Sequence, residues 1–184
     1  LFSLFLYDLV ATKRISYIIT KVASLLSIGV LFSVFPDSHS DVRLVGLISL
    51  CVALTHCILI YQSSEFEAFY LRFARNFPYH RWQLYAQQVA LLSVLLLPEG
   101  VWLMVAGGLK RGFTGALMIV SISLLFRTLL YRLGQRMDTY LRIVFGLFTF
   151  FLVLILFSGT EVLIIGSGVG AWMLLSGYQN PPVA

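Results

Sequence analysis

The sequence predicts an all-α integral membrane protein, and three observations carry this prediction. Hydrophobic residues make up 59% of the 184 residues and charged residues only 11%, whereas ordinary globular domains have about 25% charged residues. Six apolar runs approach the roughly 20 residues that a helical span needs. The net charge of +5 comes from basic residues that collect between the runs, which is typical of membrane topology rather than of nucleic-acid binding.

The first 14 residues are expected to form an amphipathic segment that lies along the cytoplasmic interface. The apolar stretch here precedes Lys13 and Arg14, whereas a secretory signal places its charges before its apolar run. The alternative is the tail of a span whose beginning is missing. Residues 15–184 are then expected to form one transmembrane domain.

The six apolar runs are the expected spans of this domain. They cover residues 15–35, 44–61, 84–106, 113–131, 141–157 and 162–175. The last two runs are short, about 17 and about 14 residues, and only "SGTE" joins them. Their length leaves open a re-entrant-like hairpin that does not fully cross the membrane.

Orientation follows from the basic residues, because lysine and arginine concentrate on the cytoplasmic side. With the amino terminus inside, ten basic residues lie on that side and three lie outside. The inner set is Lys13, Arg14, Lys21, Arg72, Arg75, Arg81, Arg127, Arg132, Arg136 and Arg142, and the outer set is Arg43, Lys110 and Arg111. We therefore expect a multi-pass protein of the cell membrane, of the bacterial inner-membrane type, with both termini cytoplasmic. Lys21, inside the first run, is expected to extend toward the near interface.

A polar island, "SSEFEAFYLRFARNFPYHRWQ", separates the second and third runs. Ser64 and Glu67 have capping-box spacing, which predicts that a helix starts there. Pro78 disfavours helical geometry at the preceding residue, so the helix should end at 77. The aromatic residues Phe66, Phe69, Tyr70, Phe73 and Phe77 fall on one face of this helix, and Arg75 points the opposite way. The simplest interpretation is an interfacial helix that only anchors a loop in membrane lipids.

A second interpretation comes from a family resemblance. An interfacial helix before six spans, a charged cytoplasmic helix after the second span and a short final hairpin resemble the membrane subunits of type-2 ABC exporters. The segment that follows the second span in that family carries an acidic residue, a leucine, basic residues and then a proline. Glu67, Leu71, Arg72, Arg75 and Pro78 occur here in that order. The resemblance covers most of the chain as topology and residues 66–85 as motif.

The resemblance implies a transport function that depends on partner chains. Residues 64–77 would be a coupling helix that rests on a separate ATP-binding subunit, and a second membrane subunit, a copy or a related chain, would complete the pathway. The coupling residues would be Glu65, Glu67, Arg72, Arg75, Phe77 and Pro78. ATP and Mg²⁺ would be bound by the partner, because this chain has no G-x-x-x-x-G-K-[ST] loop. We therefore expect no catalytic residue, no metal ligand and no enzyme activity in this chain.

The alternative function is a structural subunit that holds together a larger membrane complex, for which packing glycines and an aromatic belt would suffice. A membrane enzyme ranks third. No span offers paired carboxylates, a Ser/His pair or several histidines for that chemistry.

Glu99 is the remaining candidate for a functional residue, because an ionisable side chain inside a span is costly and commonly functional. It follows Pro98, which should kink the helix and expose a carbonyl nearby. Glu99 would then line a pathway. The alternative places it near the outer headgroups, paired with Lys110 and Arg111.

The other intramembrane features have plainer interpretations. His56 has no second ligand one turn away, so it is expected to be a hydrogen-bonding core residue rather than a metal or haem ligand. Gly166 and Gly170 have the G-x-x-x-G spacing that lets two helices approach closely. Cys51 and Cys57 point to different faces of one helix and are expected to be small buried hydrophobes.

Overall fold

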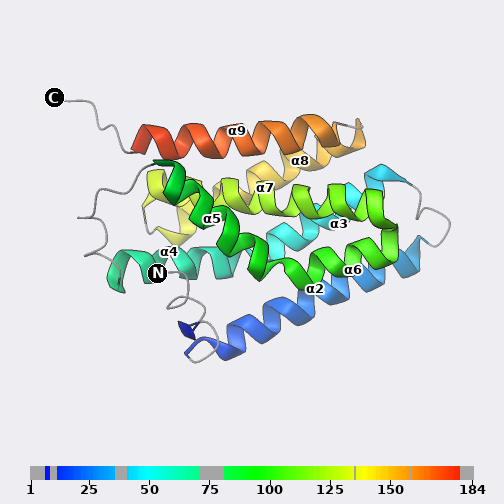
Figure 1. Cartoon of the computed structure of the whole chain (residues 1–184), viewed down its shortest axis with the longest axis horizontal. Helices are drawn as coiled ribbons and strands as arrows, with labels where there is room; N and C mark the ends of the chain where they lie inside the picture. The colour runs from blue at the N-terminus through cyan, green and yellow to red at the C-terminus, as the bar shows by residue number, and fades with distance from the viewer. Residues whose placement is uncertain are drawn as a thin grey trace.

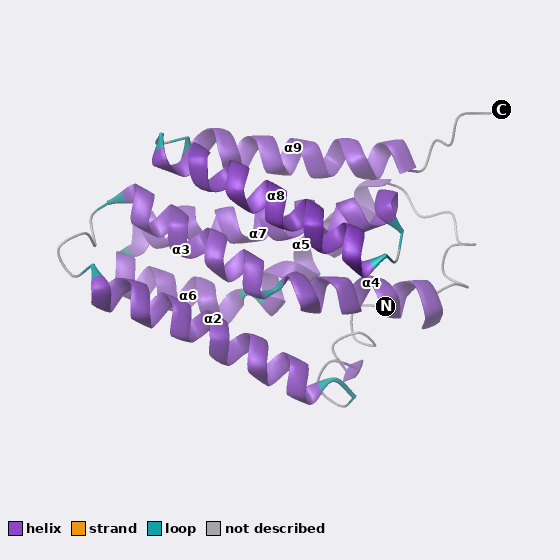
Figure 2. Cartoon of the chain, turned by 180° about the vertical axis from the view of Figure 1, so that it is seen from behind, coloured by secondary structure: helices purple, strands orange, loops and turns teal. Residues whose placement is uncertain are grey.

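A computed structural model describes residues 7–8, 12–35, 41–70, 81–134, 136–157 and 159–178. Within these ranges the chain is helical and contains no strand (Figure 2), which confirms the all-α prediction. The helices are α2 (Arg14–Val34), α3 (Val42–Thr55), α4 (Cys57–Tyr70), α5 (Arg81–Leu95), α6 (Leu97–Gly107), α7 (Leu109–Leu133), α8 (Met137–Leu156) and α9 (Thr160–Tyr178). Most of the segment 1–14 expected at the interface lies outside the described residues, as does 71–77 of the expected coupling helix.

The bundle is built around α7. This helix packs against α3, α4, α5, α6, α8 and α9, and α9 lies along much of its length (Figure 1). Its core-facing side chains include Met118, Ile122 and Phe126, all of them buried. By contrast, α2 packs against α3, α4 and α6 at the edge of the bundle.

Three helices are long and apolar enough to cross a membrane by themselves, namely α2, α7 and α8. Two bent pairs, α3 with α4 and α5 with α6, raise the number to five if each pair is one span. These helices indicate a multi-pass membrane protein, but the six predicted spans are not confirmed. The apolar part of α9, Thr160–Ser176, is shorter than the other spans.

The helix α8 is longer than the fifth apolar run, while the hairpin stays a prediction. The sequence gives this run about 17 residues, but α8 begins at Met137 and has 20 residues, enough to cross about 30 Å of hydrocarbon. The polar residues Asp138 and Arg142 do not interrupt the helix, since both lie in its first turns. The joint between α8 and α9 is short (Figures 1 and 2).

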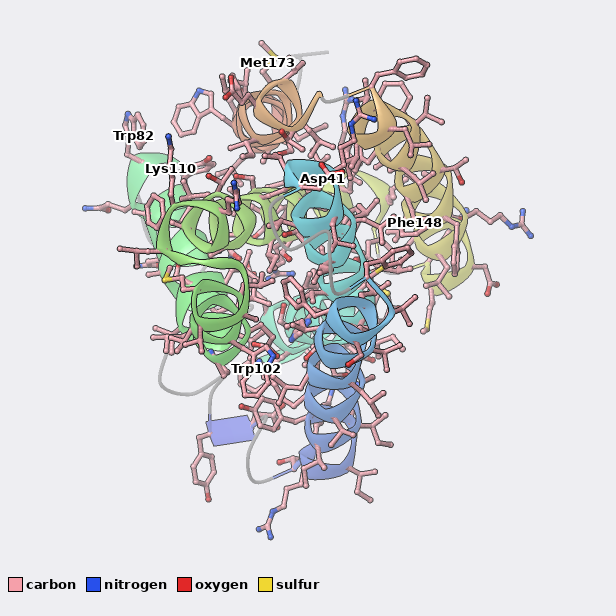
Figure 3. All side chains as sticks on the ribbon, turned by 90° about the vertical axis from the view of Figure 1, so that its right-hand side faces the viewer. Asp41, Trp82, Trp102, Lys110, Phe148 and Met173 are labelled. Carbon is pink, nitrogen blue, oxygen red and sulfur yellow. The ribbon has the colours of Figure 1, made fainter. Side chains whose placement is uncertain are left out.

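The outer surface of the bundle carries the large apolar side chains that lipid would cover. Exposed examples are Ile15 and Ile19 on α2, Phe145 on α8 and Met173 on α9. In Figure 3, Met173 and Trp82 lie at the periphery of the bundle. A soluble protein rarely exposes so much contiguous apolar surface, so this surface fits a lipid environment.

The second predicted span is broken at His56, where α3 and α4 meet at an angle of 41°. The cause is competition for one carbonyl: the Oγ1 of Thr55 and the ring Nδ1 of His56 both approach the carbonyl oxygen of Val52, at 2.8 and 2.9 Å. Side chains that bond to the preceding turn in this way bend helices. The capping-box prediction at Ser64 is wrong, because α4 passes through Ser64 without interruption.

The third predicted span is broken at Leu96, and α5 and α6 meet at 59°. The expected effect of Pro98 is confirmed here. Proline has no N–H for the carbonyl one turn earlier, and it lies in the first turn of α6. Beside the break, the carbonyl of Leu95, the last residue of α5, is bonded by the side chain of Lys21.

Candidate functional site

A cluster of ionisable side chains lies where both spans break. We call Lys21, His56 and Glu99 the charge cluster. The Nζ of Lys21 donates to both carboxylate oxygens of Glu99, at 2.8 and 2.7 Å, and also to the carbonyl of Leu95. The Oγ of Ser24, one turn along α2, donates to Glu99 Oε1 at 2.7 Å. The ammonium of Lys21 therefore joins α2 both to the carboxylate on α6 and to the carbonyl at the end of α5.

His56 joins the charge cluster from the break between α3 and α4. The ring Nδ1 lies 2.9 Å from the Val52 carbonyl oxygen, which can only accept, so Nδ1 carries a hydrogen. The ring Nε2 lies 3.4 Å from the Nζ of Lys21 and 3.5 Å from Glu99 Oε1, so it faces both a donor and an acceptor.

The two halves of the broken third span, α5 and α6, both help to hold these charges. Glu99 is in the first turn of α6, where the positive end of the helix dipole favours a carboxylate. Lys21 bonds the carbonyl at the last residue of α5, where the negative end of that helix favours a cation. Broken spans commonly use their half-helix ends in this way to hold charged groups inside a membrane.

The charge cluster is deeply buried. The side chains of His56 and Glu99 are fully buried, while that of Lys21 keeps 11% of its surface exposed. A buried charge is tolerated only when it is paired and hydrogen-bonded. Lys21 and Glu99 satisfy this condition through several bonds, and Lys21 also lies 5.7 Å from the centre of the Tyr17 ring.

These contacts correct two expectations. Lys21 does not extend to the interface, because the carboxylate of Glu99 binds it inside the bundle. Glu99 does not pair with Lys110 and Arg111, which are exposed at the start of α7. His56 has hydrogen bonds within the core, as expected. The pairing of Lys21 with Glu99 was not predicted. Each of the first three runs nevertheless carries a single Lys, His or Glu residue, which has no partner of this kind within its own run.

A second polar cluster joins α4, α5 and α7. We call Glu67, Gln88, Arg127 and Tyr131 the polar lock. Arg127 forms an ion pair with Glu67, and its Nε donates to Gln88 Oε1 at 3.1 Å. Tyr131 donates to both oxygens of Glu67 at 3.0 Å, and Gln88 donates to the Tyr131 hydroxyl at 3.2 Å.

The expected coupling residues thus fall into two groups. The carboxylate of Glu67 is bound within the chain, and Glu65 lies 3.5 Å from Lys13 with about half of its side chain exposed. Arg72, Arg75, Phe77 and Pro78 lie outside the described residues.

Close helix packing occurs at glycines that the sequence analysis did not single out. A methyl group added at Gly112 would meet the backbone of Met104, and one at Gly115 would lie 2.8 Å from Val45 Cγ1. Of the predicted pair, a methyl group added at Gly170 would lie 3.4 Å from Leu125 Cδ1, and one added at Gly166 would have no described atom within 4 Å. Gly112 and Gly115 have G-x-x-G spacing, whereas the predicted packing pair has G-x-x-x-G spacing.

Over the part of the chain that the structure describes, no three His, Cys, Asp or Glu side chains gather as a metal site would require. The chain matches no protein-family model, no curated protein and no solved structure.

Proposed function

We propose that this chain is the membrane-spanning subunit of an ATP-driven ABC-type exporter. It would form the translocation pathway with a second membrane subunit, and residues 64–77 would couple it to a separate ATP-binding chain. The proposal rests on the motif at 66–85 and on one structural observation, the polar lock.

The polar lock supports the proposal because it gives the polar island a rigid connection to the bundle. The helix α4 carries the apolar second run directly into the polar island, up to Tyr70. Glu67, near its end, is bonded to α7 through Arg127 and Tyr131, and both α7 residues are bonded to Gln88 on α5. A force applied to the segment that follows Tyr70 would therefore reach three helices together.

The charge distribution also supports it. The helices α2, α5 and α8 begin at one end of the bundle, where α7 ends (Figure 1). This basic end carries Lys13, Arg14, Arg132 and Arg136. Asp41 and Lys110, at the starts of α3 and α7, lie at the opposite end, which faces the viewer in Figure 3. The positive-inside rule makes the basic end cytoplasmic, where an ATP-binding partner would be.

The test is co-purification from native membranes followed by charge reversal. A chain with a Walker-type loop should accompany this protein, and Arg75→Glu should lower its retention or its ATPase stimulation. Arg132→Glu is the matched control, because Arg132 is an exposed basic residue at the same end of the bundle. A lipid anchor should tolerate both changes alike, since one basic residue near a membrane surface contributes only about 1 kcal/mol.

The structural-subunit alternative makes a different prediction for the same preparation. If other membrane proteins accompany the chain but no ATP-binding chain does, the exporter proposal fails and the alternative stands.

A further inference from the structure

The charge cluster has two arrangements of equal net charge, and one proton separates them. When His56 is neutral, the positive Lys21 and the negative Glu99 leave the buried group neutral overall. If His56 takes a proton, His56 and Glu99 alone form a neutral pair, provided that Lys21 leaves. Keeping all three would bury a net positive charge, which is costly in a low-dielectric interior.

Protonation of His56 acts directly on its contact with Lys21. A proton on Nε2 turns this atom from an acceptor into a donor, so it faces the ammonium of Lys21 at 3.4 Å as a second donor. The carboxylate oxygen Oε1 of Glu99 lies 3.5 Å from Nε2 and can accept the new bond. The titratable groups that face His56 Nε2 in the described part of the chain are Lys21 on α2 and Glu99 on α6.

Lys21 is the member of the cluster that can leave. Its side chain alone keeps some exposure, and it sits on a flexible four-carbon stem. It lies two turns from the start of α2, within reach of the interface that the sequence predicts for it. The ring of Tyr17, one turn nearer that interface, already faces the ammonium. The side chain of Lys21 would thus travel only a short way from the charge cluster, where the structure places it, to the interface, where the sequence predicts it.

We infer that His56 is a proton-binding site that operates a latch between α2 and the break in α5/α6. A proton from water binds His56 Nε2, the new N–H takes Glu99 Oε1, and Lys21 leaves the cluster with its charge. No covalent bond breaks, and the buried pair stays neutral. With Lys21 gone, α2 loses its two ammonium bonds to Glu99 and its bond to the Leu95 carbonyl, and only the hydroxyl of Ser24 still joins α2 to Glu99. The inference does not depend on the exporter proposal.

The test measures the distance between α2 and α6 as a function of pH. Spin labels are placed at the exposed positions Ile19 on α2 and Val101 on α6, after replacement of Cys51 and Cys57 by alanine, in lipid nanodiscs. As the pH is lowered, the distance distribution should gain a second, longer population. A reference pair at Val101 and Leu117, on α6 and α7, should not change.

Two variants identify the titrating group. His56→Gln cannot take the proton and should hold the short distance at every pH. Glu99→Gln removes the negative charge that holds Lys21 and should show the long distance at every pH. A wild-type distribution that does not change with pH overturns the inference, whatever the variants do. The same pH response in His56→Gln also overturns it, because the proton then binds elsewhere. If His56→Gln does not keep the reference distance, His56→Asn takes its place.

Discussion

The guanidinium of Arg127 on α7 is paired with the carboxylate of Glu67 on α4 and at the same time donates to Gln88 on α5. The side chain of Arg127 is almost fully buried and that of Glu67 is about three-quarters buried. A planar, forked cation can serve two acceptors in this way, whereas the ammonium of lysine is a point charge on a flexible stem.

We therefore predict that Arg127→Lys destabilises the bundle. The lysine side chain is shorter and has no planar fork of donors, so it leaves either Glu67 or Gln88 without its bond. An unsatisfied buried polar group costs about 1–3 kcal/mol. Thermal unfolding in nanodiscs measures the change. Arg132→Lys, an exposed position on the same helix, should unfold like the wild type. Equal stability of all three proteins would contradict a structural role for the polar lock.

The pairing of Lys21 with Glu99 predicts strong coupling in a double-mutant cycle. Lys21→Met leaves the carboxylate of Glu99 buried without its cation, and breaking a buried pair on one side costs about 3–5 kcal/mol. Lys21→Met combined with Glu99→Gln removes both charges and should recover most of the lost free energy of unfolding. Lys110→Met, at an exposed lysine, serves as the control. Additive losses in the double variant would show that the two charges do not interact.

The close approach of α6 and α7 predicts that Gly112 cannot be replaced by alanine without cost. The added methyl group would meet the backbone of Met104, which cannot move aside as a flexible side chain can. Overpacking of this kind costs about 1–3 kcal/mol, visible as a lower unfolding temperature. Gly146→Ala is the matched control, because an added methyl there meets no described atom within 4 Å and alanine favours helix by about 0.5–1 kcal/mol. A fall in stability for Gly146→Ala alone would reverse the assignment.

The orientation is tested by labelling single cysteines in sealed cells with a membrane-impermeant reagent. Cysteines at Asp41 and Lys110, exposed at the starts of α3 and α7, should react from outside. A cysteine at Gln83, exposed near the start of α5, should react only after the cells are opened. Labelling of Gln83 in intact cells would invert the topology and remove the basis for a cytoplasmic partner at that end.

The sequence predicted those features that local physics decides. The first span, 15–35, agrees with α2 to within one residue at each end, because Arg14 precedes and Pro36 follows an apolar run in which Lys21 is the one charged residue. The break near Pro98 was also predictable, since proline acts on its own turn.

The break at His56 was not predictable, because no proline or glycine marks it and its cause is a set of side-chain bonds to Val52. The capping-box spacing at Ser64 does not start a helix, because a capping box needs a non-helical residue at the cap and Ser64 lies inside α4. The pairing of Lys21 with Glu99 depends on how α2 packs against α6, which no local pattern encodes.

The two helix breaks separate two sets of contacts that the broken spans make with α7. On one side of them, the polar lock fastens α4 and α5 to the later half of α7. On the other side, Gly112 and Gly115 seat α6 and α3 against the earlier half of α7. The two broken spans are thus each held to the unbroken helix α7 at two levels. The bonds of Lys21 to Glu99 and to the Leu95 carbonyl lie between those levels.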